Sequence, residues 1–99
     1  MNTEKMIERF LTYVKCDSMS DDTSSAGPST EKQWDIARFL EKELTGLGMQ
    51  QVKTDAFGFV TAMLPASPGV KGPSVGFMAH YDTIPGFSGT DVKARIIKG

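Results

Sequence analysis

Apolar residues recur at helical spacing in two parts of the chain, and the first of these parts covers residues 3–15. Its apolar positions fall on one face of a helix and its charged side chains on the other, which is typical of an amphipathic helix. We place the N-cap at Thr3, because a threonine hydroxyl can accept a hydrogen bond from an amide of the first turn. The apolar face consists of Met6, Ile7, Phe10, Leu11 and Val14.

The second helical pattern begins at Thr30. Thr30 and Gln33 have the spacing of a capping box. In this motif the threonine hydroxyl accepts a hydrogen bond from the Gln33 amide, and the Gln33 side chain accepts one from the Thr30 amide. Gly46 and Gly48 provide a stop signal, since glycine tolerates the left-handed conformation that ends many helices. The apolar stripe consists of Trp34, Ala37, Leu40, Leu44 and Leu47, widened by Ile36 and Phe39.

Between the two predicted helices, residues 16–28 are rich in Ser, Asp, Gly and Pro and show no periodicity. This composition favours hydrogen bonds between side chains and the nearby backbone over helix or strand. A loop of this length is uncommon inside a small domain and is either functional or mobile. The sequence leaves both interpretations open.

A β-hairpin is predicted after the second helix. Residues 51–55 alternate, with Val52 facing inward, and residues 59–64 are rich in strand formers. Residues 56–58 between them suit a tight turn. The following segment, residues 65–73, contains several prolines and glycines and is predicted to be a loop.

A third strand is predicted at residues 74–80, which are apolar on both faces. A strand of this kind belongs inside a sheet that is covered by helices on both sides. Residues 91–98 are a weaker candidate for a further strand. The fold class is therefore α/β, with two helices followed by a hairpin and a central strand of a mixed sheet. The apolar positions are Val75, Phe77 and Ala79 on one face, and Gly76 and Met78 on the other.

The composition is that of an ordinary globular chain and excludes several kinds of partner. The 99 residues suffice for one domain at most, with 39% hydrophobic residues, 23% charged residues and a net charge of −1. This balance, without a basic cluster, gives no reason to expect nucleic acid or an anionic membrane as a partner. No apolar run approaches the ~18 residues of a membrane span.

The single cysteine, Cys16, cannot form an internal disulfide, which suits a reducing compartment. The N-terminal residues also lack the apolar core of a signal peptide, so we expect a cytoplasmic protein. A thiolate nucleophile needs a neighbouring base, and the chain contains one histidine. We therefore interpret Cys16 as a half-buried structural residue.

The candidate chemistry lies in the stretch GFMAHYDTIP, residues 76–85. His80 ends the predicted third strand, and ligands gather at the carboxyl ends of strands in open α/β sheets. Because side chains alternate along a strand, His80 and Asp82 project to the same side. The carboxylate can then hold the proton on one ring nitrogen, and the other nitrogen can bind a metal ion. The alternative is a histidine that bonds to a neighbouring carboxylate for structural reasons only.

One histidine does not make a metal site, because zinc takes three or four protein ligands. No second histidine is present, and the remaining acidic residues have no motif around them. Either the metal interpretation is wrong, or the rest of the site is outside these 99 residues.

Residues 77–85, FMAHYDTIP, resemble the first metal-binding segment of the peptidase T family, tripeptide aminopeptidases of the di-zinc clan that also contains acylases and carboxypeptidases. The His-x-Asp-Thr pattern is specific to the clan, and the Pro-Ser-Thr-Glu segment at residues 28–31 narrows the resemblance to peptidase T. The resemblance covers nearly the whole chain. The further matching segments are residues 8–14, 28–34, 47–49 and 62–66.

The resemblance implies roles for two residues. His80 matches the histidine that binds one of two zinc ions, and Asp82 matches the active-site aspartate that orients this histidine. The remaining ligands and the glutamate base have no counterpart in the chain. Residues 1–99 are therefore expected to be the N-terminal portion of a single catalytic domain, without the rest of that domain or the lid or dimerisation domain.

The implied reaction is the release of the N-terminal residue of a tripeptide by a metal-activated water, and the isolated chain is expected to be inactive. Cobalt and manganese suit similar sites as well as zinc. Two alternatives remain, an N-acyl amino-acid deacylase that uses the same His80 and Asp82, and a small non-catalytic α/β binding or assembly module. Without its neighbours, the strand at residues 74–80 is expected to drive formation of a homo-oligomer or a swapped dimer.

Overall fold

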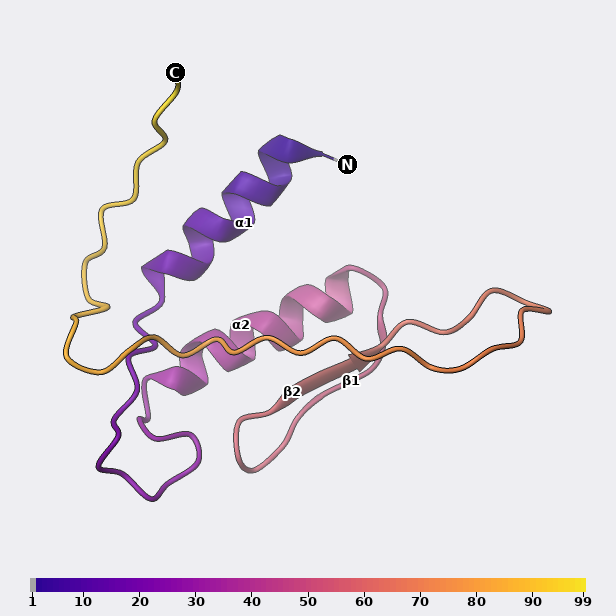
Figure 1. Ribbon diagram of the computed structural model, residues 1–99, viewed down its shortest axis with the longest axis horizontal. Helices are drawn as coiled ribbons and strands as arrows, with labels where there is room; N and C mark the ends of the chain where they lie inside the picture. Colours follow the sequence, from indigo (N-terminus) through magenta and orange to yellow (C-terminus); the bar gives the residue numbers. More distant parts are fainter. Residues whose placement is uncertain (1) are drawn as a thin grey trace.

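The computed structural model describes residues 2–99, which form two helices and a two-stranded antiparallel hairpin (Figure 1). Helix α2 packs against both strands of the hairpin, and the small core lies at this contact. Neither of the two helices is long and apolar enough to cross a membrane. The elements are α1 (Thr3–Lys15), α2 (Gln33–Gly46), β1 (Gln50–Thr54) and β2 (Val60–Met63).

Helix α1 covers the predicted residues, but its cap is one residue earlier than predicted. The Asn2 carboxamide oxygen accepts a hydrogen bond from the Lys5 amide at 3.1 Å, and Thr3 lies inside the first turn. Asparagine is a better cap than threonine, and one residue of slippage is enough to exchange them. None of the helical side chains is fully buried, so the apolar face of α1 is only partly covered within residues 2–99.

The N-terminus of helix α2 does not contain the predicted capping box. The Thr30 hydroxyl donates to the Met19 carbonyl at 2.9 Å, and the Gln33 amide group donates to the Ser29 hydroxyl at 3.0 Å. Both side chains therefore bond to the loop that precedes the helix. The helix begins instead after Lys32, which has helical backbone angles and makes no side-chain cap.

The C-terminus of helix α2 confirms the predicted stop signal. Gly48 has a φ of +83°, and its amide donates to the Thr45 carbonyl at 3.0 Å. The Met49 amide donates to the Leu44 carbonyl at 3.2 Å, which completes a Schellman motif. These bonds satisfy the last carbonyls of the helix and direct the chain into strand β1.

The predicted hairpin is confirmed, with strand ends shifted by one residue. Lys53 pairs with Thr61, and a bulge lies between Gln50 and Lys53. The Asp55 carboxylate closes the turn, because it accepts hydrogen bonds from two amides of residues 57–59. The half-buried side chains of the sheet are Val52, Thr54, Val60 and Ala62, and the buried apolar residues of α2 are Ile36 and Ala37.

The predicted central strand at residues 74–80 is wrong for this structure, and so is the weaker strand candidate at residues 91–98. Phe77 is 95% exposed and Met78 is 100% exposed. A strand requires a neighbour that pairs with its backbone amides and carbonyls. In the part of the chain that is described, no such neighbour lies beside residues 74–80, and the sheet has two strands rather than a covered central one.

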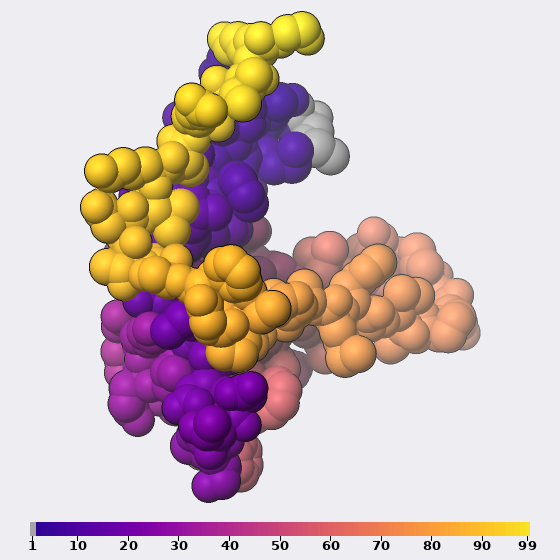
Figure 2. All heavy atoms as spheres, turned by 60° about the vertical axis from the view of Figure 1, so that its left-hand side comes forward, coloured from indigo at the N-terminus to yellow at the C-terminus, as the bar shows by residue number. Residues whose placement is uncertain are grey.

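Residues 65–73 form the predicted loop, at the end of an arm that projects from the rest of the molecule (Figure 1, Figure 2). The first part of the loop at residues 16–28 is bound to residues 81–83. Met19 forms a parallel bridge with Thr83, so the loop lies beside residues 81–83, next to the candidate pair His80 and Asp82. This contact places the candidate site between the two helices and the returning chain.

Candidate functional site

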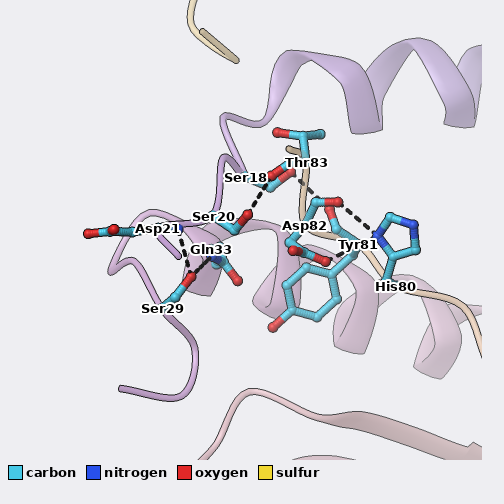
Figure 3. Close-up of polar contacts among 9 residues, drawn as sticks. All are labelled: Ser18, Ser20, Asp21, Ser29, Gln33, His80, Tyr81, Asp82 and Thr83. Carbon is cyan, nitrogen blue, oxygen red and sulfur yellow. Dashed lines mark hydrogen bonds and ion pairs between the residues drawn. The ribbon is translucent and has the colours of Figure 1, made fainter. Parts of the chain in front are cut away.

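His80 and Asp82 contact each other as their spacing predicts (Figure 3). The His80 Nδ1 atom lies 3.1 Å from Asp82 Oδ1 and 2.9 Å from the Asp82 backbone oxygen. The backbone oxygen can only accept a hydrogen bond, so Nδ1 must carry the proton in this arrangement. In the neutral imidazole, the lone pair is then on Nε2.

The other side of the imidazole is open. The His80 side chain is 85% exposed, and Nε2 has no hydrogen-bond partner within residues 2–99. Figure 3 shows this nitrogen on the side of the ring that faces away from Asp82. An exposed nitrogen with a free lone pair is the form of histidine that binds a metal ion.

The donor set fits one ligand of a metal site and not a complete site. Within residues 2–99, no three side chains of His, Cys, Asp or Glu come close enough together to hold an ion. Zinc needs at least two further protein ligands. The assignment of His80 as a metal ligand and of Asp82 as an active-site residue therefore stays a prediction.

Tyr81 connects the site to the turn of the hairpin. Its hydroxyl donates to the Gly58 carbonyl at 2.7 Å. Burial raises the pKa of the Tyr81 phenol, and the charges of Asp82 and Asp55 raise it further. Tyr81 therefore remains a neutral hydrogen-bond donor at physiological pH and is not a base.

Cys16 lines the same region and is half-buried, as predicted. Burial raises the pKa of its thiol, and the charge of Asp35 acts in the same direction. The thiol therefore stays protonated, which disfavours a nucleophilic role.

The sequence interpretation missed the residues that hold the site in place. Ser18 and Ser20 bond to the backbone on both sides of Asp82, and Tyr81 bonds to Gly58. The one available signal was the composition of residues 16–28, which favours bonds from serine side chains to backbone groups. That signal does not identify the partner, which is 63 residues away in the sequence.

No protein-family profile matches the chain. Among curated proteins, it is 48% identical over 94 residues to peptidase T from an Exiguobacterium species and 48% identical over 95 residues to peptidase T from Geobacillus thermodenitrificans. It is also 50% identical over 94 residues to peptidase T from Caldanaerobacter subterraneus subsp. tengcongensis. These alignments cover 95 to 96% of the chain but 23% of each relative, so the chain spans about a quarter of their length. The resemblance indicated by the sequence motifs is thereby confirmed, and the chain is a homologue of peptidase T along nearly all of its own length.

Proposed function

We propose that the chain contributes a metal-ligating histidine, His80, and its orienting carboxylate, Asp82, to a metal-dependent aminopeptidase that acts on tripeptides. The observation that carries this proposal is the geometry of the pair in a homologue of peptidase T. Asp82 holds Nδ1–H through two oxygens, and Nε2 is left exposed. The remaining ligands and the general base belong to parts of such an enzyme outside residues 1–99.

The residues of this chain have two tasks in the proposed reaction. His80 presents the Nε2 lone pair to a zinc ion, and Asp82 keeps the proton on Nδ1 and increases the basicity of the ring. A bound pair of zinc ions supplies an activated water and polarises the scissile carbonyl. The product is the free N-terminal residue together with a dipeptide.

We further propose that residues 1–99 form one portion of a single cytoplasmic catalytic domain and are inactive alone. One imidazole supplies a third or a quarter of the protein ligands that zinc takes. Activity therefore requires the other parts of the domain.

A chimera tests the proposal. The matching segment of Geobacillus thermodenitrificans peptidase T, 95 residues in the alignment, is replaced by the corresponding residues of this chain. Tripeptide hydrolysis and bound metal are then measured. We expect the chimera to bind its full complement of metal and to cleave tripeptides, and a folded chimera without metal or activity would refute the proposed contribution of this chain.

Three variants of the chimera test the assigned residues. His80→Ala should lose one metal equivalent per chain. Asp82→Asn should retain most of the metal but lose activity by about 10- to 100-fold, the usual cost of removing the partner of a metal-bound histidine. Asp91→Asn makes the same chemical change at a more exposed aspartate and should leave both measurements unchanged. Full metal content in His80→Ala would refute the ligand assignment.

A further inference from the structure

Three successive peptide groups around Asp82 are held by residues 18–20 (Figure 3). The Tyr81 carbonyl accepts a hydrogen bond from the Ser18 hydroxyl at 2.9 Å. The Thr83 amide donates to the Ser18 carbonyl at 3.0 Å. The Thr83 carbonyl accepts from the Ser20 amide at 2.9 Å and from the Ser20 hydroxyl at 2.8 Å. No peptide plane from residue 81 to residue 84 is therefore free to rotate.

The middle peptide group determines what His80 contacts. In a trans peptide, the N–H and the C=O point in opposite directions. The Thr83 amide points toward Ser18, so the Asp82 carbonyl of the same peptide group points away from Ser18 and toward His80 Nδ1, which lies 2.9 Å from it. Ser18 and His80 thus lie on opposite sides of one peptide group.

The Ser18 side chain is buried, and its hydroxyl bonds to the peptide group that precedes Asp82. The residue is 2% exposed, and Ser18 and Gln33 are the two buried polar residues of the described chain. A buried hydroxyl costs free energy unless it makes a hydrogen bond. The partner of the Ser18 hydroxyl is Tyr81, the residue directly before Asp82 and directly after His80.

The segment that carries Ser18 is itself anchored. The Asp17 carboxylate accepts hydrogen bonds from the Met19 amide at 3.2 Å, from Lys32 Nζ at 3.1 Å and from the Thr90 hydroxyl at 2.8 Å. These contacts come from three different parts of the chain. They give residues 18–20 a fixed position from which to hold the peptide groups around Asp82.

We propose that Ser18, assisted by Ser20, is a positioning residue that keeps the proton of His80 on Nδ1 by fixing the peptide groups on both sides of Asp82. Ser18 does not touch His80 and acts through the backbone of residues 81–83. That the free Nε2 atom serves to bind a metal ion rests on the proposed function. That Ser18 controls the tautomer is independent of the proposed function.

Nuclear magnetic resonance of the chain itself tests the proposal, because His80 is its single histidine. In the neutral ring, the ¹⁵N shifts report the ratio of the Nδ1–H tautomer to the Nε2–H tautomer, so the spectra are recorded at a pH high enough for the imidazole to be neutral. We expect Nδ1–H to dominate in the wild type and the ratio to fall in Ser18→Ala by up to about fivefold, the effect of His80 losing one of its two contacts to Asp82 when the peptide groups shift. Ser18→Thr retains the hydroxyl and should restore the ratio.

Two additional variants make the result decisive. Ser24→Ala removes a serine hydroxyl of the same loop that bonds to Ala26 and not to residues 81–83, and it should leave the ratio unchanged. Ser18→Cys keeps nearly the same volume but has a weak donor, so it decides the question if Ser18→Ala loses its dispersed amide spectrum. A wild-type ratio in a folded Ser18→Ala or Ser18→Cys variant overturns the proposal.

The readout uses no metal and no peptide, so it separates this proposal from the proposed function. A folded chimera without metal or activity, together with a tautomer that depends on Ser18, refutes the metal role and supports the positioning role. An active chimera together with a tautomer that ignores Ser18 refutes the positioning role alone.

Discussion

Substitution of Gly58 by alanine tests whether the hairpin turn and the Tyr81 side chain depend on each other. Gly58 has a φ of +86°, and its carbonyl accepts the hydrogen bond from the Tyr81 hydroxyl. A Cβ atom at this position would lie 2.8 Å from the Tyr81 hydroxyl oxygen and 3.1 Å from Pro28 Cδ. The alanine methyl group and the Tyr81 hydroxyl therefore compete for the same space.

Two costs add in Gly58→Ala. The left-handed backbone costs an alanine about 1 kcal/mol or slightly more relative to glycine. Displacement of the Tyr81 hydroxyl loses a hydrogen bond worth about 1 kcal/mol. The free energy of unfolding should therefore fall by about 2 kcal/mol. Gly48→Ala is the matched control, because Gly48 has a φ of +83° and no atom within 4 Å of an added Cβ. Only the first cost, about 1 kcal/mol, applies to it.

Urea titrations followed by the fluorescence of Trp34, the single tryptophan, measure these free energies. The decisive comparison repeats Gly58→Ala in a Tyr81→Phe background, where no hydroxyl remains to be displaced. There the alanine should cost about 1 kcal/mol less than in the wild type, which is the coupling energy of a double-mutant cycle. Equal costs in the two backgrounds would refute the argument that the Tyr81 hydroxyl and Gly58 are coupled.

Two other predictions concern the acid sensitivity of the loop and the exposed arm. The Thr90 hydroxyl, which donates to the Asp17 carboxylate, is the main group that holds the pKa of Asp17 below its usual value. A lowered folded-state pKa stabilises the fold above the unfolded-state pKa, about 3.9, and this contribution is lost as the pH falls through the folded-state value. The urea midpoint of the wild type should therefore fall more steeply with acid than that of Asp17→Asn, and parallel profiles would contradict the assignment. The unpaired apolar residues Phe77 and Met78 should drive self-association, so serine at both positions should shift sedimentation toward the monomer, whereas serine at the exposed Ile97 should not. A wild-type chain that sediments as a monomer at high concentration would contradict this prediction.

The helices were predictable because their signals are local. Residues 3–15 carry the apolar period within four turns. Helix α2 ends with bonds between residues three and five positions apart, from Gly48 to Thr45 and from Met49 to Leu44. The hairpin is local in the same sense, since Asp55 closes the turn between two adjacent strands. Each of these elements needs no information from a distant part of the chain.

The capping box shows how a tertiary contact overrides a local signal. Thr30 and Gln33 have the correct spacing, yet their side chains bond to Met19 and Ser29 of the preceding loop. The Gln33 amide, which the Thr30 hydroxyl was expected to cap, donates instead to the Thr30 backbone carbonyl at 3.3 Å. The local pattern was correct in its residue types and wrong in its partners, because the position of the loop is decided by contacts with residues 81–83.

The central strand failed for a different reason. The apolar pattern of residues 74–80 describes an environment, namely cover on both faces and pairing on both edges. Residues 2–99 provide neither, so the segment stays extended without ladder hydrogen bonds and exposes Phe77 and Met78. A helix carries its hydrogen bonds within itself, whereas a strand depends on a neighbour, and so the same kind of evidence predicted the helices and not this strand.

The contact between His80 and Asp82 was expected from strand periodicity, but it forms where no strand exists. Two residues of separation in any extended segment bring these side chains to one side, so the failure of the strand does not remove the contact. The hydrogen bonds that hold this segment come from Ser18 and Ser20, in a loop for which the sequence left both a mobile and a functional interpretation open. The geometry of the site therefore depends on the loop at residues 16–28 and not on the sheet. Under the role proposed for Ser18, substitutions at residues 17–20 act on the imidazole through the backbone of residues 81–83, whereas residues 65–73 make no hydrogen bond to residues 80–83 within the described part of the chain.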